Sequence, residues 1–324
     1  TVKPPKNPDA FHGKLEEPEM KLAFSTLGCP DFDWKDIYTM AKDFGFSGIE
    51  LRGLGNDIFS VHARPFRKEN LAQTKALLTR QHLEIPCLST GCSLKFPERR
   101  EETLAEIREY IDLAEQLGTP YIRILGDLTA APEGEVDDGA VLESLKALAP
   151  LAEKAGVTLL VETNGVYADT ARLRDLLNQV RSDSVAALWD IHHPYRYAGE
   201  SPEETVTNLG AYIKYVHVKD SVMENGKVSY RMMGEGDLPM EDVIRTLRSI
   251  NYEGYLSLEW LKQYAPDLND AGIVFPHYAN YMSQYLGSAR DSGRLQQNRT
   301  GTGKYVWPKE TLLDLTFSQV LDRM

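Results

Sequence analysis

Eight short apolar runs recur along the chain with longer amphipathic segments between them, and this alternation limits the folds that the chain can adopt. The runs are rich in β-branched and aromatic residues, which is typical of buried strands. They lie at 21–26, 47–52, 84–90, 121–125, 157–162, 185–190, 212–218 and 254–260. Helical patterns follow at 33–45, 67–82, 98–118, 138–156, 169–180, 201–210 and 239–250.

Strands that alternate with helices predict a parallel sheet, and eight such strands are the number that closes into a (β/α)₈ TIM barrel. Gly45, Gly118 and Gly156 stand where helices end, and Asp33, Asp169 and Ser201 stand where helices begin. A doubly wound open sheet is the competing fold. The first run lacks the Gly-rich phosphate fingerprint of that fold, so we expect the barrel.

The length of 324 residues fits one barrel with extensions at both ends. We expect an N-terminal arm over 1–20, the barrel over 21–286, and a linker with a C-terminal helical extension over 287–324. Two interpretations of this last segment stay open. It either leads into a partner domain C-terminal to residue 324, or it is an arm that packs on a neighbouring subunit of a homo-oligomer.

Charge and composition limit the partners. The formal net charge of −12 argues against nucleic acid, because phosphate binding needs a basic surface. No stretch approaches the ~20 apolar residues that span a membrane, and the polar start has no apolar signal core. Three cysteines without zinc-type pairing indicate a reduced setting, so we expect a cytoplasmic protein.

Each of the last four predicted strands has a metal-binding type of residue at or near its carboxyl end. Active sites of such barrels lie at the carboxyl ends of the strands, where this chain has Glu162, Asp190, His217 and Glu259. Three converging carboxylates would repel one another without a cation between them. We therefore predict one divalent metal ion held by all four residues. Three oxygen donors and one imidazole suit Mn²⁺, which we expect, with Mg²⁺, Co²⁺ or Zn²⁺ as alternatives.

Four further residues are candidate substrate contacts. His193 follows Asp190 by three positions, although it could instead cap a turn. Lys219 points to the same side as His217, where it either contacts substrate or pairs with a carboxylate. Glu235 lies in a Gly-flanked loop, and Glu50 lies near the end of the second strand, where an internal ion pair with Arg52 is the plainer expectation.

The motifs DIHHP, HVKD, GEGDLP and NYEGYLSLEW, with FSTLGCPDFDW and GFSGIELR near the start, resemble the xylose isomerase-like barrels of the sugar phosphate isomerase/epimerase superfamily. The resemblance covers roughly residues 21–286. It implies a metal-bound sugar or polyol, with Glu162 and Glu259 on opposite sides of the substrate as an acid/base pair. Asp190 and His217 would complete the metal sphere.

The predicted activity is that of a divalent-metal-dependent isomerase or epimerase of a keto-sugar or related polyol. The ion would stabilise the enediolate that forms when one glutamate removes the proton next to the carbonyl. Alternatives are an inosose-type dehydratase, the metal-binding subunit of a C-glycoside-cleaving lyase, and a non-catalytic accessory subunit. An endonuclease IV-like phosphodiesterase shares the barrel, but seven histidines and the negative charge oppose it.

Overall fold

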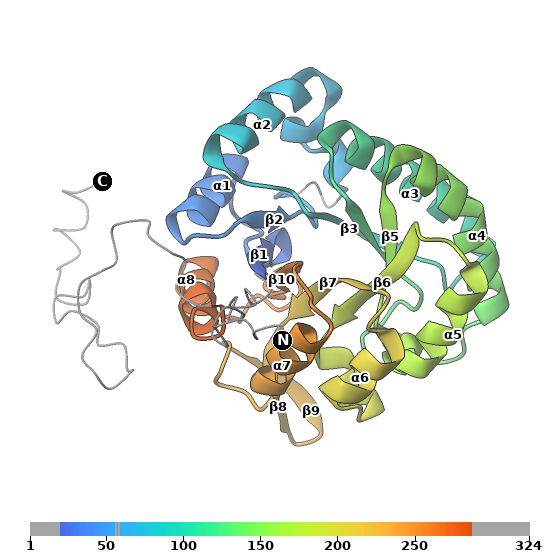
Figure 1. Cartoon of the computed structure of the whole chain (residues 1–324). Coiled ribbons are helices and arrows are strands. Elements are labelled where there is room, and N and C mark those ends of the chain that lie inside the picture. The colour runs from blue at the N-terminus through green and yellow to red at the C-terminus, as the bar shows by residue number, and fades with distance from the viewer. Residues whose placement is uncertain (1–19, 56, 58, 287–324) are drawn as a thin grey trace, which may run out of the picture. The chain divides into compact units, whose positions relative to one another are not determined.

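The computed structural model describes residues 20–55, 57 and 59–286. Within them eight parallel strands form a barrel inside a ring of helices, so the predicted TIM barrel is confirmed (Figure 1). The strands are β1 (Lys21–Ser25), β2 (Gly48–Glu50), β3 (Cys87–Ser93), β4 (Tyr121–Leu125), β5 (Thr158–Glu162), β6 (Val185–Asp190), β7 (Ile213–Val218) and β10 (Tyr255–Leu258). Each lies within three residues of its predicted bounds.

The strand order is β2-β1-β10-β7-β6-β5-β4-β3, with every neighbouring pair parallel. Two isolated parallel bridges, Gly48 to Glu84 and Leu51 to Leu88, join β2 to the chain at β3. These bridges close the sheet on itself. The four strands β5, β6, β7 and β10 are therefore consecutive neighbours in the wall of the barrel.

Helices cover the outside of the barrel in chain order (Figure 1). They are α1 (Trp34–Asp43), α2 (Lys68–Gln81), α3 (Arg100–Leu117), α4 (Asp138–Ala155), α5 (Thr170–Val180), α6 (Pro202–Leu209), α7 (Met240–Ser249) and α8 (Ala271–Met282). Side chains of Asp33, Asp169 and Ser201 cap three of them as predicted. Gly118 and Gly156 end α3 and α4 with positive φ angles.

Side chains that point into the barrel change character along its axis. Because strand residues alternate in direction, every second residue faces inward. Part of the interior is a small, mainly apolar cluster of Ala23, Cys87, Leu160, Ala186, Leu188, Tyr215 and Tyr255. Glu162, Asp190 and His217 lie two residues beyond Leu160, Leu188 and Tyr215, and Glu259 lies four residues beyond Tyr255. Apolar packing thus fills the base, and the polar cluster lies above it towards the carboxyl ends.

A β-hairpin follows β7 and had not been expected. Its strands are β8 (Asp220–Glu224) and β9 (Lys227–Arg231), joined at Asn225 and Gly226, which both have positive φ angles. The Asp220 carboxylate accepts backbone hydrogen bonds from Gly234 and Gly236, both 2.9 Å long. This carboxylate fixes the loop that returns from the hairpin to α7.

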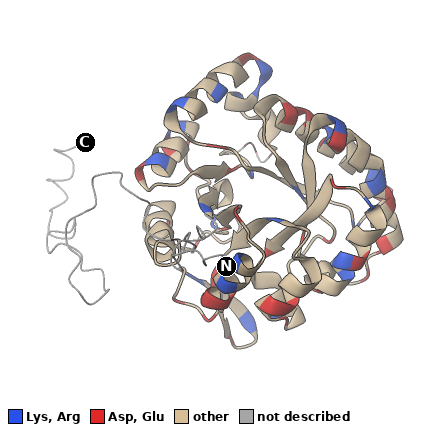
Figure 2. Ribbon diagram, viewed as in Figure 1, with Lys and Arg blue, Asp and Glu red and all other residues tan. Residues whose placement is uncertain are grey.

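The predicted arm over 1–20, apart from Met20, and the predicted extension over 287–324 lie outside the described residues. Among the described residues, none of the helices combines the length and the hydrophobicity that a membrane span requires. Residues of both charges are interspersed over the outer helices (Figure 2).

Candidate metal centre

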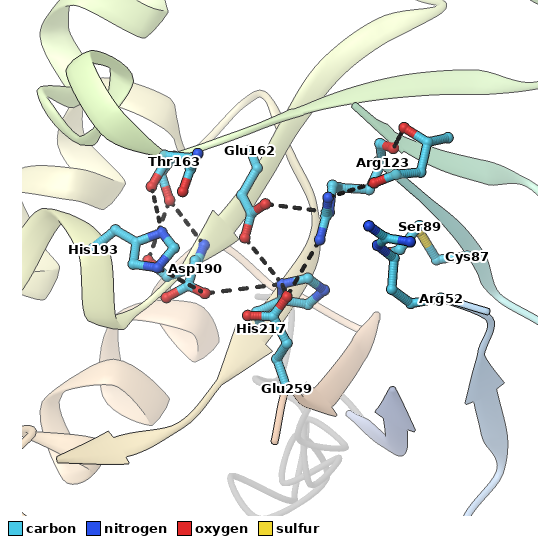
Figure 3. Close-up of polar contacts among 12 residues, drawn as sticks. Arg52, Cys87, Ser89, Arg123, Glu162, Thr163, Asp190, His193, His217 and Glu259 are labelled. Atoms are coloured by element: carbon cyan, nitrogen blue, oxygen red, sulfur yellow. Dashed lines mark hydrogen bonds and ion pairs between the residues drawn. The ribbon is translucent and has the colours of Figure 1, made fainter. Parts of the chain in front are cut away.

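The four predicted ligands converge at the carboxyl ends of neighbouring strands. Glu162 and Asp190 are the last residues of β5 and β6, His217 is the penultimate residue of β7, and Glu259 directly follows β10. One donor atom from each lies within 4.8 Å of the others. Nδ1 of His217 lies 3.2 Å from Glu162 Oε1, 3.6 Å from Glu259 Oε1 and 3.9 Å from Asp190 Oδ2. Figure 3 shows these side chains pointing toward one another.

Two buried cations lie against the cluster. Nε of Arg123, on β4, is 3.2 Å from Glu162 Oε2, and its Nη2 is 3.3 Å from Glu259 Oε1. Lys219 pairs with Glu259 and lies 2.6 Å from Asp190 Oδ2. The ion pair that was the alternative expectation for Lys219 is therefore present. Arg123 had not been singled out, although an arginine at an inward position of the apolar run YIRIL is a visible signal.

These cations keep the glutamates ionised. Burial alone would raise the pKa of Glu162, but Arg123 and His217 outweigh it and lower the pKa to about 2. Burial is likewise outweighed at Glu259, where Lys219, His217 and Arg123 hold the pKa well below its usual range. Both side chains are thus available as anionic ligands.

The charge balance of the cluster fits a divalent ion. Three ligand carboxylates and Glu50 face two permanent cations, which leaves an excess of two negative charges when His217 is neutral. Asp190 Oδ2 is buried, and the Lys219 ammonium is its ion-pair partner. A bound divalent cation would neutralise the excess charge and take this oxygen as a ligand.

Glu50 lies behind His217, on the side away from the other carboxylates. Both of its oxygens are 3.0 Å from His217 Nε2, and each also accepts a 2.6 Å hydrogen bond, from Ser89 or from Ser257. We expected a substrate contact or an ion pair with Arg52. The structure instead buries Glu50 completely and pairs it with His217, because the inward position on β2 points beneath the imidazole.

The two histidines after β6 have different environments. His193 Nδ1 is 3.1 Å from the carbonyl oxygen of Thr163, and its Nε2 is 3.8 Å from Asp190 Oδ2. His193 therefore presents Nε2 to the cluster. His192 is fully buried, and its Nε2 lies 3.0 Å from Ser221 Oγ. Burial and the nearby Lys219 lower the pKa of His192 to about 2.

Glu235 is exposed on the loop after the hairpin and is not brought to the cluster. Two tyrosines that had not been predicted lie closer to the cluster, beside His192 and His193. The Tyr230 ring, on β9, is 5.7 Å from that of His192, and the Tyr197 ring is 6.0 Å from that of His193. Both are partly buried and form an aromatic wall beside Lys219.

The family described as xylose isomerase-like TIM barrel matches residues 39–273. Fructoselysine 3-epimerase of Shigella flexneri is 26% identical over 264 residues, which cover 76% of this chain and 91% of that protein. Inosose dehydratase of Clostridium botulinum is 26% identical over 190 residues, which cover 49% of this chain and 63% of that protein.

Solved structures agree on the fold. A crystal structure of the IOLI protein with a bound zinc atom superposes with a TM-score of 0.66 at 17% identity, covering 82% of this chain and 99% of that one. A xylose isomerase-like TIM barrel protein from Mycobacterium smegmatis in complex with magnesium gives 0.62 at 18% identity, covering 82% and 96%. At these identities the similarity shows the barrel alone.

Proposed function

Because the chain belongs to the xylose isomerase-like TIM barrel family, we propose that it is a divalent-metal-dependent epimerase or isomerase of a keto-sugar or related polyol. Sugar epimerases and dehydratases among its relatives agree with the prediction of an enzyme that acts on sugars. The observation that carries the proposal is the convergence of four donor side chains from four neighbouring strands.

Glu162, Asp190, His217 and Glu259 would hold the ion. Their hard oxygen and borderline nitrogen donors suit Mn²⁺, which we expect, and also Mg²⁺, Co²⁺ or Zn²⁺. When bound, the ion would supply Lewis acidity that polarises the substrate's carbonyl group.

Glu162 and Glu259 are the proposed acid/base pair. One glutamate takes the proton from the carbon next to the carbonyl, and the electron pair of that bond moves towards the carbonyl oxygen. The other glutamate, which is ionised in the cluster, first takes up a proton from solvent as substrate binds and then gives it to the opposite face of the same carbon, which inverts the centre. The two have exchanged protonation states after one turnover. Arg123 contacts both carboxylates, so it can compensate the charge on whichever one is ionised.

Substrate recognition is assigned to the side chains around the mouth of the cluster. His193 is held through Nδ1 by the Thr163 carbonyl, so its Nε2 can bond a substrate oxygen. Lys219 is placed to polarise a second oxygen because its Nζ already lies among the ligand carboxylates. Tyr197 and Tyr230 offer aromatic faces on which the apolar face of a sugar can pack.

Similarity to an inosose dehydratase favours a second candidate reaction. The same base would remove the proton next to the carbonyl, and the protonated glutamate would then give its proton to the hydroxyl that leaves from the adjacent carbon. Water and an unsaturated ketone result. The cluster serves either reaction, so the position of a leaving hydroxyl on the substrate decides the product.

NMR in D₂O with a panel of ketoses and inososes tests the proposal. We expect solvent deuterium at the carbon next to the carbonyl, with Mn²⁺-loaded protein and not with chelator-treated protein. Glu162→Gln should abolish the exchange, while Glu84→Gln, outside the cluster, should keep it. Isomerisation that retains the original hydrogen would instead indicate a hydride shift and contradict proton abstraction by a glutamate.

A further inference from the structure

Glu50 is a fully buried carboxylate that none of the proposed chemical steps uses. It lies on β2, which only β1 separates from the ligand strand β10, and is 0% exposed. An ionised carboxylate in such a place is costly unless it is paired and hydrogen-bonded. It forms a 3.0 Å contact with Nε2 of His217, which is also 0% exposed.

The hydrogen bonds around Glu50 fix which groups donate. A carboxylate only accepts, so the hydroxyls of Ser89 and Ser257 donate to it across 2.6 Å. His217 Nε2 lies 3.0 Å from both oxygens and therefore also donates. These donors together bond both oxygens of the Glu50 carboxylate.

The opposite ring nitrogen faces the metal ligands. Nδ1 of His217 lies 3.2 Å from Glu162 Oε1 and 3.6 Å from Glu259 Oε1. A neutral imidazole has one N–H and one lone pair. If Nε2 keeps its hydrogen for Glu50 when a metal ion binds among the carboxylates, Nδ1 is the nitrogen that gives up its proton and offers a lone pair to the ion.

We propose that Glu50 is a positioning residue that keeps the hydrogen of His217 on Nε2 and thereby directs the Nδ1 lone pair to the metal ion. The inference rests on the metal site of the proposed function. Ser89 on β3 and Ser257 on β10 orient the Glu50 carboxylate from two other strands. Such partners behind a metal-binding histidine set its tautomer and raise its basicity.

The first test is NMR of wild-type protein labelled with ¹⁵N-histidine, with the His217 signals assigned through His217→Asn. We expect a proton on Nε2 in the metal-free protein and in the Zn²⁺-loaded protein, with Zn²⁺ coordination reported at Nδ1 only. An Nε2 without a proton in either state overturns the inference. This readout needs no Glu50 variant and no enzymatic activity.

The second test compares Zn²⁺ dissociation constants by competition with a chromophoric chelator. Glu50→Gln keeps the size of the side chain but lets its amide donate to Nε2, so we expect affinity to fall roughly 10- to 100-fold. Glu50→Asp should recover part of the loss. Asp127→Asn, which removes another buried carboxylate of the barrel outside the cluster, should leave affinity unchanged.

Melting curves of the metal-free variants show whether each is folded. A folded Glu50→Gln protein that binds Zn²⁺ as tightly as wild type overturns the inference and leaves the proposed function standing. A wild-type protein that binds no divalent ion contradicts the proposed function. It also overturns the inference, because the Nδ1 lone pair of His217 would then have no metal ion to bind.

Discussion

Nζ of Lys219 lies 2.6 Å from Oδ2 of Asp190, so this buried carboxylate among the four candidate ligands has an ammonium group as its ion-pair partner. The Lys219 ammonium group therefore neutralises part of the negative charge of the four candidate ligands. It also opposes a second cation at Asp190, His192 and His193, the other group of potential ligands that shares this carboxylate. We therefore expect the first group, and not the second, to hold the single ion of the proposed function.

Replacing Lys219 should affect metal binding and turnover in opposite directions. Lys219→Met removes a positive charge next to the ion, so we expect the divalent ion to bind about tenfold more tightly. Turnover should fall at least 100-fold, because the proposed contact to a substrate oxygen is lost. Calorimetric titration with Mn²⁺ and steady-state kinetics measure the two effects. Weaker Mn²⁺ binding in the variant would contradict the competition between the two cations.

Replacing Arg123 should make the stability of the protein depend on metal. Arg123→Met leaves Glu162 and Glu259 without their shared buried partner, which typically costs about 3–5 kcal/mol. A bound divalent ion should restore part of that loss. Urea unfolding with and without chelator measures it. Arg172→Met breaks a partly exposed ion pair with Asp138 outside the cluster and serves as the control, with a loss that does not depend on metal.

Burial of His192 should make the protein acid-sensitive. The unfolded chain takes up a proton near pH 6.5, whereas the folded protein does not until pH falls to about 2. The unfolded state therefore binds more protons between these values, and stability decreases as pH falls, by at most about 1.4 kcal/mol per pH unit for this group. In the His192→Gln variant, the decrease in the free energy of unfolding between pH 6.5 and pH 4.5 should be smaller than in the wild-type protein. Parallel stability curves for the two proteins would exclude this role.

We expect the aromatic wall of Tyr197 and Tyr230 to contribute to substrate binding and not to metal affinity. Tyr230 lies on the hairpin against His192 and is not one of the four donors. We expect Tyr230→Ala to lower kcat/KM by roughly tenfold or more through lost packing, with an unchanged Mn²⁺ dissociation constant. Tyr230→Phe should keep most of the activity. Equal losses in both variants would assign the effect to the hydroxyl group.

Much of the barrel could be predicted because local signals agree with its global design. The periodicity of apolar residues predicts the strands, and residue types at the helix starts predict caps such as Asp33 and Ser201. The same pattern predicts that four side chains lie together at the carboxyl ends of neighbouring strands: Glu162, Asp190, His217 and Glu259. Barrel geometry converts a position at a strand end into a position at a common mouth. These residues could therefore be grouped before any distance was known.

The partners of these residues could not be predicted in the same way. The contact of Glu50 with His217 joins residues 167 positions apart and depends on the orientation of the imidazole ring. Arg123 reaches Glu259 across 136 positions. Periodicity shows which side chains point inward, but long-range packing decides which of them touch.

The hairpin after β7 was missed although its signal was present. The segment DSVMENGKVSYR places Asn225-Gly226 between two stretches suited to strands, a pattern typical of a two-residue hairpin turn. Tyr230 was missed with it, since only the pairing of β8 and β9 turns that side chain toward His192.

Metal stoichiometry tests the central claim most directly. Protein purified without chelators and reconstituted with Mn²⁺ should contain about one ion per chain, because a single set of four ligands holds it. The double variant Glu162→Gln, Glu259→Gln should contain almost none while keeping its barrel fold by circular dichroism. Wild-type protein that binds no divalent ion, or a double variant that binds as much as wild type, would contradict the account.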